Sequence, residues 1–122
     1  MFDFREELKS RTKKFALRII RLCQSLPQTP EAYVIKKQML RSGTSVGANY
    51  RAACRARSNA EFFSKISIVI EEADETMFWL ELLQEAEIVK AELVTDLYQE
   101  NEEILKIMVK AREHSKKDKT FN

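Results

Sequence analysis

The chain contains very few residues that can end a helix or form a tight turn. Its 122 residues include two glycines and two prolines, and both prolines lie within residues 27–30. Glutamate, lysine, leucine and alanine, which favour helices, are abundant instead. We therefore expect long helices joined by short connections, in one domain large enough to bury its own core.

The spacing of apolar residues predicts two helices in the first half of the chain. In the first, at about residues 4–26, apolar side chains recur three and four residues apart and share one face. Pro27 ends this helix, and Thr29 followed by Pro30 is typical of the start of the next one. The same spacing continues over about residues 30–57, which predicts a second helix there.

Two further helices are predicted in the second half. Ser58 and Glu61 have the spacing of a capping box, in which each side chain satisfies a free amide group at the helix start. They begin a third helix at about residues 59–87. A fourth helix is expected at about residues 91–113, although neither glycine nor proline separates it from the third.

The four predicted helices define the fold class. Residues 115–122 are rich in lysine and are expected to form a flexible basic tail. Residues 1–114 are expected to form a single all-α domain. Amphipathic helices joined by short connections favour an up-down-up-down four-helix bundle.

The second helix carries both glycines, Gly43 and Gly47, although each costs a helix about 1 kcal/mol relative to alanine. Its inward positions hold mainly small side chains: Ser42, Val46, Asn49 and Ala53. Small residues let two helices approach closely. Because the apolar spacing continues through both glycines, we expect an unbroken helix in close contact with a neighbour. Asn49 would then be a buried amide that selects one packing arrangement, or a group that contacts a ligand.

Charge is distributed unequally along the chain. Residues 1–57 carry 13 lysines and arginines against 4 acidic residues, whereas residues 58–122 carry 8 against 15. On the first helix, four cations at helical spacing share one face: Arg11, Lys14, Arg18 and Arg21. This face either pairs with the acidic helices or contacts the phosphates of a nucleic acid.

The third helix contains a dense acidic cluster. Its members are Glu71, Glu72, Asp74 and Glu75. A carboxylate-bridged metal centre in a helical bundle also needs histidines at fixed spacing, and the one histidine, His114, lies far along the chain. We therefore expect no metal or other cofactor, and we expect Glu72 and Glu75 to pair with Arg41, Arg51 or Arg55 across two helices.

Neither cysteine suggests catalysis. Cys23 and Cys54 lie in helical segments without a histidine that could act as a base, so free thiols of a cytoplasmic protein are expected. The sequence contains no apolar run long enough to span a bilayer. We expect a protein that is neither an enzyme nor associated with a membrane.

The apolar surface of the third helix is wider than one bundle can cover. The residues that extend it are Phe63, Phe78, Trp79, Leu82 and Leu83. Large exposed apolar patches mark interaction sites. We expect a homo-oligomer in which these residues, Tyr50 and the small-residue second helix lie near the contact between subunits.

Several short motifs on the second and third helices resemble those of one protein family. They are Ser45-Val46, Ala48-Asn49-Tyr50-Arg51, Glu61-Phe62, Glu72-Ala73-Asp74-Glu75 and Trp79-Leu80. The chain resembles small bacterial four-helix-bundle proteins related to those encoded by intervening sequences of large-subunit ribosomal RNA genes. The accessory proteins of diversity-generating retroelements belong to the same family. Many of these proteins continue after the asparagine with Ile-Ala-Glu-Gly, where this chain has Tyr50-Arg51-Ala52-Ala53.

The resemblance implies a left-handed bundle that assembles into a ring, often a pentamer, with a basic surface suited to nucleic acid. Two hypotheses follow. In the first, the oligomer binds RNA or DNA, or a nucleic-acid-handling partner such as a reverse transcriptase, through basic faces. In the second, it is a protein–protein scaffold whose charges are used within the assembly.

Overall fold

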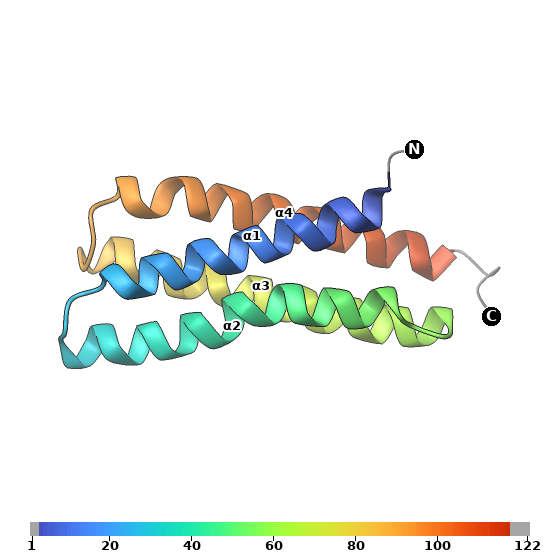
Figure 1. Ribbon diagram of the computed structural model, residues 1–122, viewed down its shortest axis with the longest axis horizontal. Coiled ribbons are helices and arrows are strands. Elements are labelled where there is room, and N and C mark those ends of the chain that lie inside the picture. Colours follow the sequence, from blue (N-terminus) through green and yellow to red (C-terminus); the bar gives the residue numbers. More distant parts are fainter. Residues whose placement is uncertain (1–2, 118–122) are drawn as a thin grey trace.

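Four α-helices make up the part of the chain that the computed structural model describes, residues 3–117. They are α1 (Phe4–Ser25), α2 (Pro30–Cys54), α3 (Asn59–Glu85) and α4 (Glu92–Lys117). Successive helices run antiparallel along a common axis, which gives an up-down-up-down bundle (Figure 1). Each helix packs against two neighbours, and α1 and α4 are the least closely packed neighbouring pair. The expected all-α fold is confirmed.

The core forms where the apolar faces of the four helices meet. Each helix contributes fully buried side chains at three- and four-residue spacing, as an amphipathic helix requires. The largest of them are Leu8, Phe15, Ile19, Met39, Val46, Ile66, Val69, Leu80, Leu83, Val94, Ile104 and Met108.

Side-chain caps fix three of the helix starts. The Asp3 carboxylate accepts hydrogen bonds from the backbone N–H groups of Arg5 and Glu6 at the start of α1. The Thr29 and Ser58 hydroxyls accept from the third residue after them, at the starts of α2 and α3. These bonds satisfy amide groups that have no partner within the helix. A capping box would bring the Glu61 carboxylate to the backbone N–H of the cap residue, Ser58. Instead, this carboxylate accepts a hydrogen bond from the N–H of Arg57, one residue earlier, at 3.5 Å.

A change of backbone conformation ends α3 without glycine or proline. Glu87 adopts a left-handed conformation with φ of 56°. The N–H of Ile88 donates to the carbonyl of Leu83, and the N–H of Glu87 donates to the carbonyl of Gln84, both at 3.0 Å. This pair of bonds is the Schellman motif, in which the left-handed residue is usually glycine.

The fourth helix is longer than the sequence suggested, and the flexible tail expected over residues 115–122 is wrong for its first part. α4 continues to Lys117, and Ser115 is buried. The Ser115 hydroxyl donates to the Asn59 side-chain oxygen at 2.7 Å, and the Asn59 amide donates to the Ser115 carbonyl. This contact with the start of α3 extends the ordered helix beyond residue 114. Residues 118–122 lie outside the described part of the chain.

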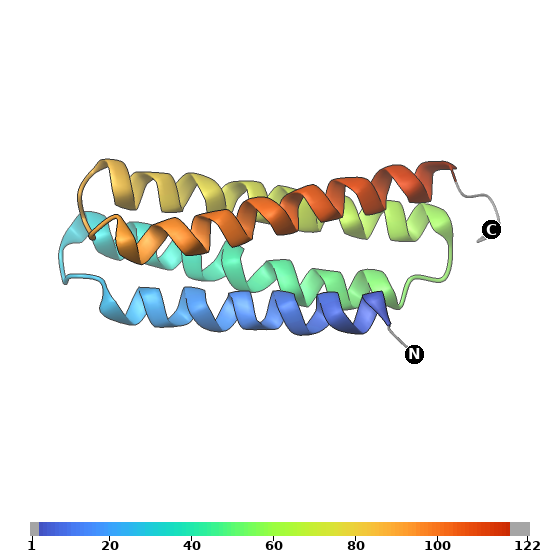
Figure 2. The same cartoon turned by 90° about the horizontal axis from the view of Figure 1, so that it is seen from above.

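Helix α2 is continuous through both glycines, and it bends near its middle (Figures 1 and 2). Both glycines are buried. A methyl group built on Gly43 would lie 2.9 Å from Cγ1 and Cγ2 of Ile19, so this glycine lets α1 and α2 approach closely. At Gly47 the nearest atoms belong to Thr12, at 3.4 Å. The expected close contact is therefore present, and its partner is α1.

Candidate nucleic-acid interface

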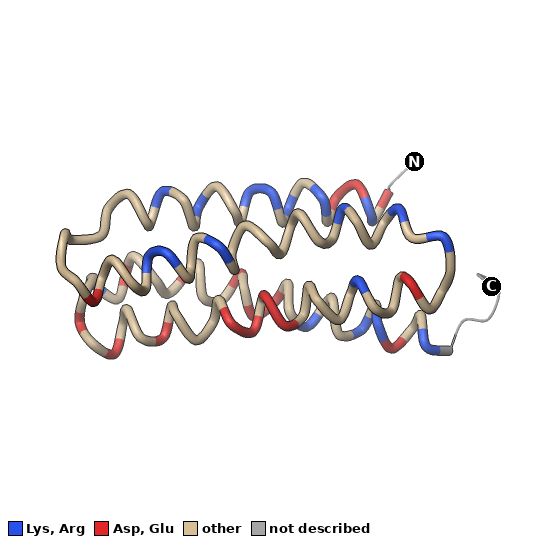
Figure 3. The backbone as a smooth tube through the Cα atoms, turned by 90° about the horizontal axis from the view of Figure 1, so that it is seen from below, with Lys and Arg blue, Asp and Glu red and all other residues tan. Residues whose placement is uncertain are grey.

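Basic and acidic residues occupy different sides of the bundle. Figure 3 shows lysine and arginine along α1 and α2, and most of the acidic residues along α3 and α4. This arrangement follows from the uneven distribution along the sequence, because the first two helices pack side by side. The α1–α2 side therefore presents a positive surface.

Arg11 is the member of the predicted basic face that lies within an ion-pair network. Its Nε and Nη2 atoms donate to the two carboxylate oxygens of Glu100 at 2.7 and 2.8 Å, and Nη2 also lies 2.9 Å from Glu103. The hydrogen bond to Glu100 is the main cause of a raised Arg11 pKa. A bidentate arginine–carboxylate pair of this kind restricts the relative orientation of the two side chains and adds to their attraction. Arg11 thus joins α1 to α4.

The other three cations of that face have no carboxylate partner within the described residues. Lys14 and Arg21 are exposed and Arg18 is half-buried. Arg18 and Arg21 line a groove of about 300 Å³ between α1 and α4, together with Leu93 and Leu97. These side chains are placed where a polyanion could reach them.

A second and more basic groove lies between α1 and α2. We call it the α1–α2 basic groove and define it by Lys9, Lys13, Arg51 and Arg55, which line a cavity of about 390 Å³ with Glu6 and Ser10. Lys9 pairs with Glu6 at 2.9 Å, whereas the other three cations form no ion pair within the described chain. An adjoining hollow has a floor of small residues: Ala16, Thr44, Gly47 and Ala48.

Sequence reasoning offered Arg51 and Arg55, as alternatives to Arg41, as partners of Glu72 and Glu75, and it did not identify this groove. The sequence did contain an indication of the groove: Lys9 and Lys13 on α1, and Arg51 and Arg55 on α2, are each four residues apart and so share one face of their helix.

Two members of the acidic cluster of α3, Glu72 and Glu75, pair with Arg41 of α2. Its guanidinium lies 2.9 Å from Glu72 and also contacts Glu75. The Trp79 indole N–H donates to Glu75 at 3.0 Å. This hydrogen bond, together with Arg41, lowers the pKa of Glu75. Beside this network the buried hydroxyls of Thr76 and Ser42 lie 2.8 Å apart, which adds a second polar contact between α2 and α3.

Asn49 is half-buried, and its amide donates to the carbonyl of Ser45 within the same helix at 2.9 Å. Among the described residues, no hydrogen bond links the Asn49 side chain to another helix. The buried amide of the bundle is Asn101, which is fully buried and has no hydrogen-bond partner for either amide atom among the described residues. The sequence indicated this burial, because Asn101 lies on the apolar stripe of α4.

The apolar side chains expected at a subunit contact divide into two groups. Leu83 is fully buried in the bundle, so the expectation that it lies on an interaction surface is wrong; it shares the core-facing stripe of α3 with Leu80. Phe78 is 50% exposed and packs edge-on against the half-buried Trp79, with ring centroids 5.0 Å apart. Tyr50 is buried in the monomer, and burial raises its pKa.

Other kinds of site receive little support from the described residues. They contain no group of three or more histidine, cysteine or acidic side chains arranged to hold a metal ion. Both cysteines are free. No described helix has the length and apolar character needed to cross a membrane.

The chain is similar to known proteins over most of its length. Residues 6–110 match the family model described as 23S rRNA-intervening sequence protein. The crystal structure of a protein of unknown function from the S23 ribosomal protein family of Bacteroides thetaiotaomicron VPI-5482 has a TM-score of 0.81. The two sequences are 39% identical, and the match covers 86% of this chain and 97% of that chain. No curated protein matches the chain. Neither description names an enzymatic activity.

Proposed function

This chain belongs to the 23S rRNA-intervening sequence protein family, and we propose that it is a non-enzymatic helical-bundle protein that binds RNA or DNA through the basic side of α1 and α2. The observation that supports this proposal best is the α1–α2 basic groove. Three of its four cations, Lys13, Arg51 and Arg55, are exposed and lack a carboxylate partner within the described chain. Such cations gain most from contact with phosphate, because no internal ion pair has to be broken.

The expected mode of binding is through the phosphate backbone. Lysine and arginine side chains on an exposed helix surface position a nucleic acid without reading its bases. Lys14, Arg18 and Arg21 extend the positive surface along the opposite side of α1. Arg11 takes a different role in this proposal: it holds α1 against α4 and thereby keeps the neighbouring cations in place.

Assembly into a homo-oligomeric ring, with five subunits as the expected number, is part of the proposal. The exposed Phe78 ring and its neighbour Trp79 support a contact between subunits on α3. A ring would repeat each basic groove, and several weak sites on one particle bind a polyanion with increased avidity. A cytoplasmic location fits the free thiols of Cys23 and Cys54.

Fluorescence anisotropy with labelled RNA and DNA, measured over a range of salt concentrations, tests the proposal. Binding should weaken steeply as salt increases. With duplex DNA, the magnitude of the slope of log K against log salt should fall by about 0.9 for each phosphate that a variant no longer neutralises. The variant combining Lys13→Glu, Arg51→Glu and Arg55→Glu should bind at least tenfold more weakly at low salt. A second variant, with Lys14, Arg18 and Arg21 changed to glutamate, tests the face predicted from the sequence.

The matched control reverses three cations on the acidic side of the molecule: Lys65, Lys90 and Lys106. It changes the net charge by the same amount as either test variant but leaves both basic grooves intact. Equal losses of affinity in the test and control variants would mean that net charge alone determines binding. Absence of binding at low salt would refute the proposal.

A protein–protein scaffold is the second candidate, and the exposed apolar side chains favour it. Phe78 is 50% exposed on α3, and Tyr33 and Val34 are 59% and 56% exposed on α2. These residues could contact a partner such as a reverse transcriptase or another nucleic-acid-handling protein. Recovery of the same protein partner after nuclease treatment, with loss of that partner in a Phe78→Ser variant, would favour this candidate.

A further inference from the structure

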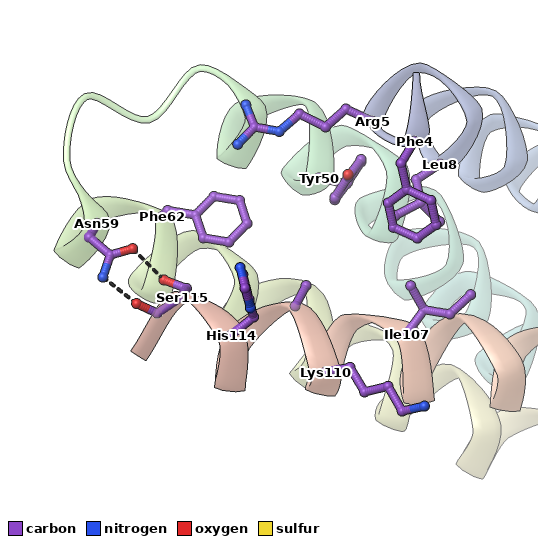
Figure 4. A pocket seen from close by; sticks show the side chains of 11 residues that line it. Phe4, Arg5, Leu8, Tyr50, Asn59, Phe62, Ile107, Lys110, His114 and Ser115 are labelled. Atoms are coloured by element: carbon purple, nitrogen blue, oxygen red, sulfur yellow. Dashed lines mark hydrogen bonds between the residues drawn. The ribbon is translucent and has the colours of Figure 1, made fainter. Parts of the chain in front are cut away.

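A cavity of about 410 Å³ lies at the end of the bundle where α1 begins and α4 ends. Figure 2 shows α1 and α4 diverging toward this end, and Figure 4 shows the side chains that line the space between them. All four helices contribute to its lining. We propose that this cavity binds a small amphipathic anion: a molecule with one anionic group and a compact aromatic or apolar body.

The walls suit the apolar body. Leu8 and Tyr50 are buried at the base of the cavity, and Phe62 and Ile107 form part of its sides. Figure 4 shows these side chains directed toward a common space, with Phe4 at its edge. Aromatic side chains of this kind give a flat ring system a large contact area. The volume lies within the range of small-molecule sites in proteins, about 300–1,000 Å³.

The charges around the cavity suit the anionic group. Arg5, Lys110 and His114 line it, and no carboxylate does. None of the three forms a salt bridge within the described residues. The Arg5 guanidinium lies over the Phe62 ring, 5.9 Å from its centroid. A charged group for the anion and an apolar surface for the body of the ligand are therefore adjacent.

Arg5 and His114 are the principal partners that we assign to the anionic group. They reach the cavity from α1 and α4, whereas the Lys110 side chain is directed away from Phe62 (Figure 4). The nearby Asp3 carboxylate already accepts hydrogen bonds from the backbone of Arg5 and Glu6, at 3.0 and 3.3 Å. The start of α1 is therefore capped, and the anion must be held by side chains.

One wall of the cavity is fixed before any ligand binds. Asn59 at the start of α3 and Ser115 near the end of α4 exchange two hydrogen bonds, drawn as dashed lines in Figure 4. These bonds hold the C-terminal turn of α4 against α3 while its neighbour α1 diverges. A cavity with preformed walls loses less entropy when it binds a ligand.

This site is separate from the proposed nucleic-acid interface. Tyr50 is buried and lines the cavity, whereas Arg51 beside it is exposed and lines the α1–α2 basic groove. The two sites therefore use different, non-overlapping sets of side chains on α1 and α2. Loss of one activity by substitution should leave the other in place.

Isothermal titration calorimetry with the full chain tests the proposal with three probes. 2-Naphthoate represents a hydrophobic carboxylate, adenosine monophosphate represents a nucleotide, and 2-naphthalenemethanol is the uncharged counterpart of the first. At least one of the two anions should bind with one site per chain, and 2-naphthoate more tightly than its uncharged counterpart. Binding of only one anion shows whether the cavity prefers a hydrophobic carboxylate or a nucleotide phosphate. No binding of either anion at millimolar concentration overturns the proposal.

Two substitutions of exposed residues locate the bound anion without disturbing the core. Arg5→Gln should weaken anion binding about tenfold, as expected for the loss of one charge-assisted contact, and His114→Gln should weaken it severalfold. The matched control is Lys37→Gln, at an exposed cation of α2 that lines neither this cavity nor a basic groove, which should leave the affinity unchanged. Equal affinity of the Arg5→Gln variant and the unaltered chain would overturn the assignment. The triple groove variant should retain anion binding even if it no longer binds nucleic acid.

Discussion

The packing of α2 against α1 predicts that alanine at Gly43 destabilises the protein. A methyl group there would lie 2.9 Å from two carbon atoms of Ile19, closer than carbon atoms normally approach. Ile19 is fully buried and branched at Cβ, so it has little freedom to move away. Overpacking of a core typically costs about 1–3 kcal/mol. Replacing glycine in a helix by alanine returns about 1 kcal/mol. We expect a net loss of about 1 kcal/mol.

Gly47 provides a matched control in the same helix. A methyl group at this position would lie 3.4 Å from the nearest atoms of Thr12, which is an ordinary contact distance. The gain in helix propensity should therefore dominate, and Gly47→Ala should stabilise the protein by up to about 1 kcal/mol.

Urea unfolding followed by far-UV circular dichroism, at one fixed protein concentration, measures both variants. The free energies of unfolding should differ by about 1–2 kcal/mol, with Gly43→Ala the less stable. Equal stabilisation by both substitutions would show that the close contact at Gly43 does not exist in solution.

Three further predictions follow from the polar contacts. Asn101→Leu should raise the free energy of unfolding, measured in urea, by about 1 kcal/mol, because it removes a fully buried amide that has no partner in the described chain. A variant less stable than the unaltered chain would mean that the amide does have a hydrogen-bond partner. Glu100→Gln should lower the free energy of unfolding by about 1 kcal/mol, because the ion pair with Arg11 is lost. The difference in stability between the variant and the unaltered chain should become smaller in high salt, and a difference independent of salt would contradict this explanation. The hydrogen bond from Trp79 lowers the pKa of Glu75, so its contribution to stability is present above the ordinary carboxyl pKa of about 4.3 and is lost as pH falls through the lowered value. Trp79→Phe should therefore reduce the fall in stability on acidification, and an unchanged pH profile would argue against the bond.

Much of the fold could be predicted because it depends on local patterns. The three- and four-residue spacing of apolar side chains identified all four helices in the described chain, and Pro27, Thr29 and Ser58 marked two of the connections. The end of α3 lacked such a marker because a glutamate adopts the left-handed conformation there. The final turn of α4 was missed because a contact between residues far apart in sequence, Asn59 and Ser115, stabilises it.

The candidate sites were harder to predict because they depend on which helix faces lie opposite one another. Arg41, Arg51 and Arg55 were equivalent as partners for the acidic cluster, and only the packing of α2 directs Arg41 toward α3 and the other two toward α1. The pairing of Arg11 with Glu100 joins residues at distant positions in the chain. The amphipathic cavity combines side chains from four helices, so no single stretch of sequence indicates it.

The separation of charge seen in Figure 3 gives the molecule an electric dipole directed across its width. Its formal net charge is only +2, so a distant polyanion attracts it weakly. At shorter range the field of a polyanion would exert a torque that turns the α1–α2 side toward it before the two molecules touch. Orientation during approach, more than long-range attraction, would then determine how often an encounter leads to binding. At moderate ionic strength, dissolved ions would screen this orienting field at separations beyond about 10 Å.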